Sequence, residues 1–264
     1  IRNGKIRIQG CGHIKTKFHR PIEGKIRSIT IKRDCDKWFV CFCCEVSIAR
    51  GPHSDIEVGI DLGLNAFAVL DSGGRIENPR YRKNCQAQLR IAQRRLSRCR
   101  AGSNGSIRVK NRLRRLHRHV RNQRRDFLHK ISREIVNSYG FIAIENLNVK
   151  RIAKTFLSKS VNDAGWSTFI NFISYKAECA GRDIVKVNPN GTSQTCICGA
   201  RVQKSISDRW HNCASCGVSG DRDHISAKII LNRAREERSR KNVEDSISCV
   251  PRISVARQNS TSSE

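Results

Sequence analysis

The stretch that decides the fold is Val58-Gly59-Ile60-Asp61-Leu62-Gly63. Its apolar run predicts a buried strand, and a carboxylate at the end of such a strand is costly unless something pairs with it. The two glycines allow another backbone segment or a substrate to approach closely. Alone this pattern is weak support, but it makes Asp61 a candidate ligand for a divalent metal ion.

Two further acidic residues follow in comparable positions. Glu145 ends the apolar stretch 141–145, and Asp223 stands in Asp221-Arg222-Asp223 at the start of a final helix. Either one alone is weak support, because a strand-ending carboxylate often only caps a neighbouring helix and an aspartate before a helix is most often its N-cap. The three acids in this order are much more specific.

The predicted order of elements places these acids in one architecture. Apolar alternation and helical periodicity predict a hairpin at 25–32 and 37–46, and strands at 56–61, 66–70, 141–145 and 183–187. They also predict helices at 85–138 with a break at 101–106, at 166–180 and after 221, with a polar loop at 146–163. This order matches the RNase H-like nuclease architecture, an α/β fold with acids on two strands and a late helix.

In that architecture, Asp61, Glu145 and Asp223 are expected to hold two Mg²⁺ ions roughly 4 Å apart around a scissile phosphate. Mg²⁺ suits such a site because it prefers hard oxygen ligands and keeps several of its waters. Asp61 would bridge both ions, with the other two acids flanking them. No side-chain nucleophile is needed.

Four cysteines have the spacing of a zinc ribbon. They occur in Cys196-Ile197-Cys198-Gly199 and in Cys213-Ala214-Ser215-Cys216-Gly217. The second pair has the usual two-residue spacing, whereas the first is one residue short, which we expect to weaken the site although all four sulfurs still converge. A coincidental pair of cysteines is the alternative. His211 could substitute as a ligand, but its place beside Trp210 favours a strand residue.

The charge of the chain indicates a polyanionic partner. Its 264 residues contain 51 Lys+Arg against 23 Asp+Glu, a formal net charge of +28, and phosphate backbones are the obvious partner. Residues 80–130 hold a single acid, Asp126, whereas a solvated helix face usually mixes both signs. The predicted nucleic-acid contacts are Arg112, Arg114, Arg115, Arg118, Arg121, Arg124 and Arg125.

The sequence also bears on the setting in which the chain works. An acidic membrane surface is the alternative partner, but basic membrane segments normally carry an aromatic or leucine face. No apolar run approaches the roughly 20 residues of a membrane span, and no signal-peptide pattern opens the chain. We therefore expect a cytosolic protein. The chain contains no methionine and starts at Ile1, so we interpret it as part of a longer protein or of a decayed reading frame.

From about residue 25 to 234 the chain resembles the OrfB/TnpB proteins of bacterial insertion sequences, compact relatives of type V CRISPR nucleases. The matching stretches are Arg20-Pro21-Ile22-Glu23-Gly24-Lys25-Ile26, Gly59-Ile60-Asp61-Leu62-Gly63, Asn122-Gln123-Arg124-Arg125-Asp126-Phe127-Leu128-His129-Lys130, Ile144-Glu145-Asn146-Leu147-Asn148-Val149-Lys150, Val187-Asn188-Pro189, Thr192-Ser193-Gln194-Thr195-Cys196 and Asp221-Arg222-Asp223. The resemblance implies a RuvC-like endonuclease that cuts DNA under the direction of a transposon-derived guide RNA. It also implies catalytic roles for Asp61, Glu145 and Asp223, and zinc on the four cysteines. A further implication is a place in the bacterial cytosol, associated with the nucleoid.

Three departures from the family pattern are visible. The resemblance implies that the N-terminal helical region and the start of a small β-barrel are missing; the first cysteine pair is short; and His224-Ile225-Ser226-Ala227 replaces the usual Asn and two Ala after Asp223. The rival hypothesis is therefore a truncated or decayed copy that only binds DNA or RNA. The expected domains are a partial β-barrel at 1–52, the nuclease domain at 53–190, the zinc ribbon at 191–220, a last helix at 221–236 and a disordered tail at 237–264.

Overall fold

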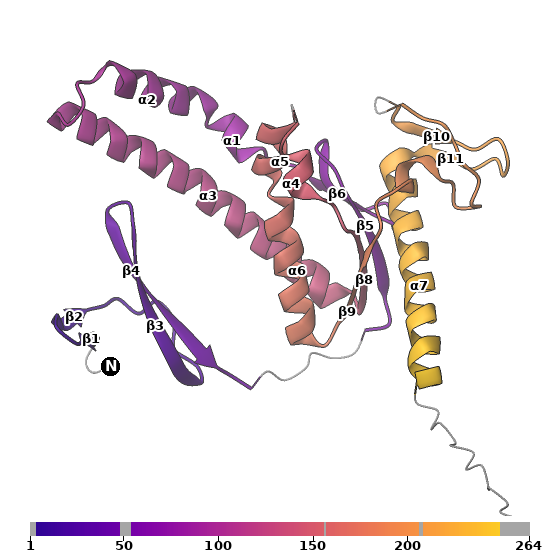
Figure 1. Ribbon diagram of the computed structural model, residues 1–264, viewed down its shortest axis with the longest axis horizontal. Coiled ribbons are helices and arrows are strands. Elements are labelled where there is room, and N and C mark those ends of the chain that lie inside the picture. The colour runs from indigo at the N-terminus through magenta and orange to yellow at the C-terminus, as the bar shows by residue number, and fades with distance from the viewer. Residues whose placement is uncertain (1–3, 48–53, 156, 206–207, 249–264) are drawn as a thin grey trace, which may run out of the picture. The chain divides into compact units, whose positions relative to one another are not determined.

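The computed structural model describes residues 4–47, 54–155, 157–205 and 208–248, with the backbone alone for 242–248 (Figure 1). The chain divides into two compact units. The first combines residues 1–49 with 87–119, and the second combines 50–86 with 120–264. This division cuts within the helical pair expected at 85–138, and the domain boundaries expected from the sequence stay predictions.

The first unit contains two separate β-hairpins. Strand β1 (Lys5–Ile8) pairs with β2 (Gly12–Lys15), and β3 (Lys25–Asp34) pairs with β4 (Lys37–Glu45), both antiparallel. The second hairpin confirms the one predicted from sequence. Its turn is tight because Cys35 adopts a left-handed conformation with a φ of 58°. The small barrel expected for this segment stays a prediction.

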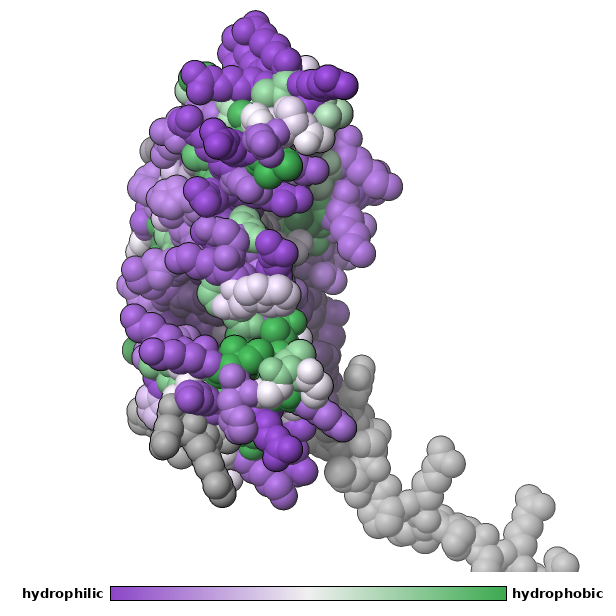
Figure 2. All heavy atoms as spheres, turned by 90° about the vertical axis from the view of Figure 1, so that its left-hand side faces the viewer, coloured by the Kyte–Doolittle hydropathy of each residue, from purple (hydrophilic) through white to green (hydrophobic). Residues whose placement is uncertain are grey.

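Two long helices carry the basic segment singled out in the sequence. Helix α2 (Gln86–Arg98) and helix α3 (Asn104–Ser138) are separated at the predicted break. Ser103 caps α3, because its hydroxyl accepts a hydrogen bond from the Ser106 amide at 3.1 Å, which satisfies one of the free amides at a helix start. Helix α3 begins in the first unit and ends in the second. In the space-filling view, hydrophilic residues predominate on the face shown (Figure 2).

The second unit is built on a five-stranded mixed sheet. Its strands are β5 (Glu57–Leu62), β6 (Ala66–Leu70), β7 (Arg75–Glu77), β8 (Phe141–Glu145) and β9 (Asp183–Val187). They lie in the order β7-β6-β5-β8-β9. The first three pair antiparallel, whereas β5–β8 and β8–β9 are parallel. The four predicted strands of this region and the α/β class are thereby confirmed.

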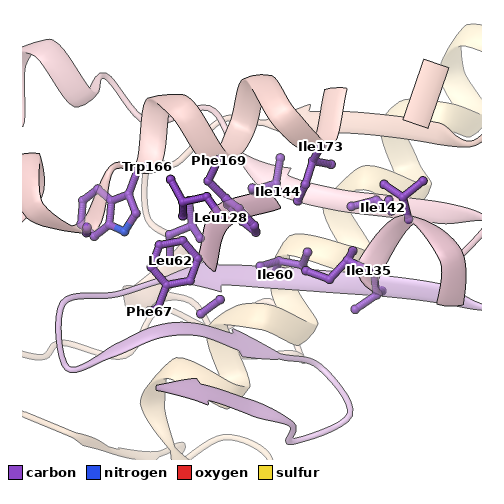
Figure 3. Close-up of a cluster of buried hydrophobic side chains, with 14 of the residues drawn as sticks. Ile60, Leu62, Phe67, Leu128, Ile135, Ile142, Ile144, Trp166, Phe169 and Ile173 are labelled. Carbon is purple, nitrogen blue, oxygen red and sulfur yellow. The ribbon is translucent and has the colours of Figure 1, made fainter. Parts of the chain in front are cut away.

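One face of the sheet packs against helix α6 (Trp166–Ala180) and the C-terminal part of α3. Figure 3 shows Phe169 and Ile173 of α6 meeting Ile60 and Ile144 from the central strands. These side chains are fully buried, and each contributes about 1.5–3 kcal/mol relative to exposure. The apolar stripe predicted for the helix at 166–180 is therefore core, as expected.

The opposite face packs against helix α7 (Arg222–Ser248). A Cβ added to Gly59 of β5 would lie 2.1 Å from the Ala227 carbonyl oxygen and 2.9 Å from the Leu231 Cβ. No side chain fits at such distances, so glycine at this position lets α7 rest directly on β5. The glycine before Asp61 thus positions a helix.

Two expectations about local structure were wrong. The polar loop expected at 146–163 contains two short helices, α4 (Val149–Ile152) and α5 (Ser158–Ala164). Helix α7 continues beyond the expected end at 236, because helix-favouring charged residues continue there and Arg240 pairs with Glu236 one turn earlier. The rest of the expected tail, 249–264, lies outside the described residues. Another short helix, α1 (Tyr81–Asn84), precedes α2.

Candidate active site and cysteine cluster

Asp61 and Glu145 end two neighbouring parallel strands. Ile60 of β5 is in register with Ile144 of β8, so the two acids that follow lie side by side at the same edge of the sheet. Side chains alternate between faces along a strand. Because Ile60 and Ile144 point into the core beneath α6, Asp61 and Glu145 point to the opposite face, which α7 covers.

Asp223 reaches the same place because α7 runs antiparallel to β5. Near the start of β5, Glu57 pairs with Arg235 at 2.6 Å and with Arg238 at 3.5 Å. Two residues farther along β5, Gly59 lies beneath Ala227. One more helical turn, about 5.4 Å, leads back to Asp223, and two more strand residues, roughly 6.6 Å, lead forward to Asp61. We call Asp61, Glu145 and Asp223 the carboxylate cluster.

Asp223 is not the N-cap of α7. The side chain of Asp221 accepts hydrogen bonds from the amides of Asp223 at 2.9 Å and His224 at 3.1 Å, which is the capping role. The Asp223 carboxylate is therefore available for other contacts. The alternative that the sequence left open for Asp223 is wrong, because a neighbouring aspartate performs that function.

Two members of the carboxylate cluster have raised pKa values. Burial, followed by the negative charges of Glu145 and Asp223, raises the pKa of Asp61 well above its ordinary value, and Arg222 lowers it in part. Burial also raises the pKa of Glu145. Clustered carboxylates with raised pKa values bind protons or cations readily. Hard oxygen donors in such a cluster fit a divalent ion such as Mg²⁺.

Two arginines contact Asp223. Arg222 lies 3.3 Å and Arg209 3.7 Å from its carboxylate oxygens. Arg222 also donates to the carbonyl of Asp208 at 2.9 Å, so it joins the acid to the segment before α7. In the sequence, Arg222 stands between two aspartates, but no sequence pattern indicated which residue its side chain would contact.

Thr192 holds Glu145. Its hydroxyl donates to the Glu145 carboxylate, and both side chains are buried. The loop that carries Thr192 is fixed by Arg233 of α7, which donates to the carbonyls of Asn188 at 3.1 Å and Asn190 at 2.8 Å. Thr192 stands in a stretch that supported the family resemblance, and this was the only sequence signal for it.

His224, which departs from the family pattern, ties α7 to the sheet. Its Nε2 lies 2.9 Å from the Asp71 carbonyl oxygen, and since a carbonyl only accepts, Nε2 carries the proton. The Asp71 carboxylate in turn accepts from the Gly59 amide at 2.9 Å. The histidine thus makes a structural contact beside the carboxylate cluster.

Four cysteines, Cys196, Cys198, Cys213 and Cys216, form a second cluster. Their sulfur atoms all lie within 4.8 Å of one another, so the predicted convergence is confirmed. Cys196 lies 3.5 Å from Cys216, and Cys198 lies 3.8 Å from Cys213. The contacts therefore cross between the two pairs. We call these four residues the cysteine cluster.

Both cysteine pairs sit in tight backbone turns. The Gly199 amide donates to the Cys196 carbonyl, and the Gly217 amide donates to the Cys213 carbonyl, each at 2.9 Å. Both glycines have positive φ, 86° and 75°, which other residues adopt only with strain. The first turn therefore closes despite its one-residue spacing. The backbone amide of Cys216, among other donors, lowers the pKa of Cys213 to about 6.

His211 lies outside the cysteine cluster. It is buried in strand β10 (Trp210–Asn212), which pairs with β11 (Ser219–Asp221). Its Nδ1 contacts the amine of Lys204. The interpretation of His211 as a strand residue is confirmed, and the ligand alternative is not supported.

The predicted nucleic-acid contacts all lie on α3, but several have partners within the chain. Arg115 and Arg118 pair with Asp36 of the β3–β4 turn, at 3.3 Å and 3.0 Å. Arg124 pairs with Asp163 at 2.9 Å. The guanidinium groups of Arg118 and Arg124 are largely covered, whereas the residues Arg112, Arg114, Arg121 and Arg125 are exposed. Arg115 is exposed as well, and Arg125 lies 3.4 Å from His129 Nε2, so exposure sets apart only Arg118 and Arg124 from the other five.

Two family models match this chain. The OrfB IS605 model, described as "Probable transposase", matches residues 41–155. The model described as "Cas12f1-like, TNB domain" matches residues 166–230. The first match includes Asp61 and Glu145, and the second includes the cysteine cluster and Asp223. The two models therefore cover both clusters.

Curated relatives agree with the family models. A protein of Streptomyces pristinaespiralis, provisionally named RNA-guided DNA endonuclease, is 32% identical over 87% of this chain and 59% of its own length. InsQ of Escherichia coli strain K12, with the same provisional name, is 28% identical over 87% of this chain and 62% of its own length. The chain thus spans about 60% of the length of these relatives.

A solved structure shares the fold. It is titled "Cryo-EM structure of CRISPR-Cas12f Ternary Complex", and its matching chain gives a TM-score of 0.50 at 21% identity. The similarity covers 78% of this chain and 44% of that one.

Among the described helices, none is both long enough and apolar enough to cross a bilayer.

Proposed function

This chain belongs to the OrfB/TnpB family of insertion-sequence proteins, and we propose that it is an RNA-guided DNA endonuclease with an RNase H-like (RuvC) domain. One observation carries the proposal. Acids far apart in sequence meet at one edge of a mixed sheet, where burial and then the negative charges of Glu145 and Asp223 raise the pKa of Asp61. Such an arrangement destabilises the empty protein, and a divalent cation relieves the repulsion.

The residues of the site have different roles. Asp61, Glu145 and Asp223 would hold Mg²⁺, which when bound supplies a Lewis acid that activates water and stabilises charge on the leaving oxygen. Thr192 keeps one carboxylate oxygen of Glu145 in place, and Arg222 does the same for Asp223. The exposed arginines of α3 would bind phosphate backbones of the guide RNA and the DNA target.

The cysteine cluster fits a structural zinc ion. A tetrahedral site with zinc–sulfur bonds of about 2.3 Å has sulfur–sulfur separations of roughly 3.8 Å. The two contacts in this cluster are 3.5 and 3.8 Å. Four thiolates close such a site and leave no position for a substrate. We therefore assign residues 191–220 as a zinc ribbon inserted between β9 and α7.

The proposal includes the remaining organisation expected from the sequence. The RuvC-like domain would span 53–190 and the start of α7, and residues 1–52 would contribute to a small β-barrel. The protein would act in the bacterial cytosol. Its substrates would be nucleic acids, with no small-molecule substrate.

The decisive experiment is cleavage by the protein co-purified with its flanking transcript. Guide-matched DNA should be cut only with Mg²⁺, and Asp61→Ala should abolish cutting while binding stays within about twofold, since affinity comes from phosphate contacts. Asp126→Ala is the matched control, because Asp126 is exposed on α3. Binding without any Mg²⁺-dependent cutting would favour the rival, a non-catalytic DNA- or RNA-binding module.

A further inference from the structure

We propose that the segment carrying the cysteine cluster positions two of the three acids. The N-terminal end of the segment, which we call its entering end, holds Glu145 through Thr192. Its C-terminal end, which we call its leaving end, holds Asp223 through Arg222 and the helix cap at Asp221. The inference rests on the proposed function, because it concerns the geometry of the same carboxylate cluster. According to this inference, the cysteine cluster joins the two ends of the segment and so keeps Glu145 and Asp223 in place.

The entering end is short and well bonded. Thr192, which holds Glu145, lies only four positions before Cys196. Between them, the Thr195 hydroxyl donates to the Gly191 carbonyl at 2.8 Å. The Val202 amide then donates to the Gln194 carbonyl at 2.8 Å, which closes the first cysteine turn immediately after the threonine. A displacement of this turn is therefore transmitted to Thr192.

The leaving end is equally direct. The second cysteine turn closes a hairpin in which the Cys213 amide donates to the Val218 carbonyl at 2.9 Å. Trp210 pairs with Asp221 at the other end of this hairpin, and Asp221 caps α7. The Arg222 amide donates to the Arg209 carbonyl at 2.9 Å. The hairpin thus sets the first turn of α7, which carries Asp223.

The sulfur contacts connect these two ends. Each close contact joins a cysteine of the first turn to one of the second, Cys196 to Cys216 and Cys198 to Cys213. An ion bound by all four would hold the two turns against each other. Because Thr192 and Asp221 lie just outside the turns, the same ion would hold the distance between Glu145 and Asp223.

Hydrogen exchange of the whole chain, before and after removal of the thiolate-bound metal, tests this coupling directly. The amides of Gln194, Asp223 and His224 should exchange at least about tenfold faster once the metal is removed. The Leu70 amide, bonded to Gly74 in the turn after β6, is the control and should not change. Faster exchange confined to residues 196–218 would overturn the proposal.

A second experiment uses variants that leave the cysteines intact. Thr192→Val removes the hydroxyl but keeps the shape, and Thr192→Ser keeps the hydroxyl. Binding of Mn²⁺ alone, followed by electron paramagnetic resonance, should weaken about tenfold or more in Thr192→Val, as is typical when the partner of a metal ligand is lost. Thr192→Ser should bind within about twofold of the unsubstituted protein. Equal binding by Thr192→Val would overturn the role of Thr192.

The two experiments separate this inference from the proposed function. If the unsubstituted protein binds no Mn²⁺, or if Asp61→Asn binds it equally well, the carboxylate cluster is no metal site and the proposed function fails. Hydrogen exchange still decides whether the cysteine cluster orders both ends. If Mn²⁺ binding requires Asp61 but neither Thr192→Val nor metal removal affects the acids, only the positioning inference fails.

Discussion

The cysteine cluster and the carboxylate cluster are both groups of candidate metal ligands, but they are assembled differently. All four cysteines lie between residues 196 and 216, and short backbone hydrogen bonds within two turns place them. The three acids lie at positions 61, 145 and 223, and they meet only because β5 pairs with β8 and α7 packs on β5. A local motif therefore forms one cluster, whereas the packing of the whole second unit forms the other.

This difference predicts that the carboxylate cluster depends on the cysteine cluster, whereas the cysteine cluster does not depend on the carboxylate cluster. Disrupting the packing of α7 should damage the carboxylate cluster and leave the cysteine cluster intact. Disrupting the cysteine cluster should damage both, because its segment holds Glu145 and Asp223. The following changes test the two halves of this comparison, from the largest expected effect to the smallest.

Removal of one cysteine ligand should have the largest effect. The purified protein should contain about one zinc ion per chain, and Cys213→Ser should lose it, because a structural site needs all four ligands. Metal analysis by mass spectrometry measures this. Cys43→Ser is the matched control, since Cys43 is an exposed thiol of β4. A full complement of zinc in Cys213→Ser would show that the cysteine cluster is not the metal site.

A methyl group at the contact between β5 and α7 should damage the carboxylate cluster and leave the cysteine cluster intact. Gly59→Ala would place its Cβ against the Ala227 carbonyl, and we expect a loss of about 1–3 kcal/mol in the free energy of unfolding, with weaker Mn²⁺ binding. Zinc content should stay unchanged. Gly105→Ala is the control, because the added Cβ would lie 3.8 Å from the Ser103 hydroxyl oxygen, an ordinary van der Waals distance, and alanine favours the helix. Concurrent loss of zinc in Gly59→Ala would contradict the one-way dependence.

The pH dependence of stability should report the repulsion among the acids. A carboxyl group whose pKa is raised by folding stabilises the folded state below its unfolded pKa, about 4, and this contribution is lost as pH rises through the folded pKa. In magnesium-free buffer at pH 7, Asp61→Asn should therefore raise the free energy of unfolding, because the amide carries no charge to be buried or repelled. Denaturant titrations should show this gain disappearing near pH 3–4. A gain that is the same at both pH values would have another cause.

Neutralising exposed arginines of α3 should affect binding alone. Replacing Arg112, Arg114 and Arg125 with Gln should reduce the slope of log affinity against log salt by about 2–3, because each phosphate contact contributes about 0.7–0.9. Electrophoretic mobility shifts at several salt concentrations measure the slope. Arg240→Gln on α7, where the arginine pairs with Glu236, is the control. An unchanged slope would remove these arginines from the interface, and both clusters should stay intact in either variant.

Much of this organisation could be predicted from the chain itself. Alternation in 37–46 and the 3.6-residue period in 166–180 reflect which side chains must be buried, so the corresponding elements were predicted correctly. The cysteine turns were predictable because spacing and following glycines act over a few residues. By contrast, the short helices within 149–164 lack a strong period, and the sequence pattern missed them.

What the sequence by itself determined is the set of ligands and the local shapes that present them. Asp61 after an apolar run, Glu145 in a similar place and the paired cysteines are properties of short segments, where propensity and burial act on neighbouring residues. The tertiary structure alone decided which groups hold those ligands. The bonds of Thr192 to Glu145, of Arg233 to the Asn188 carbonyl and of His224 to the Asp71 carbonyl join residues far apart in the sequence, and their geometry arises only when strand register and helix packing bring the partners together.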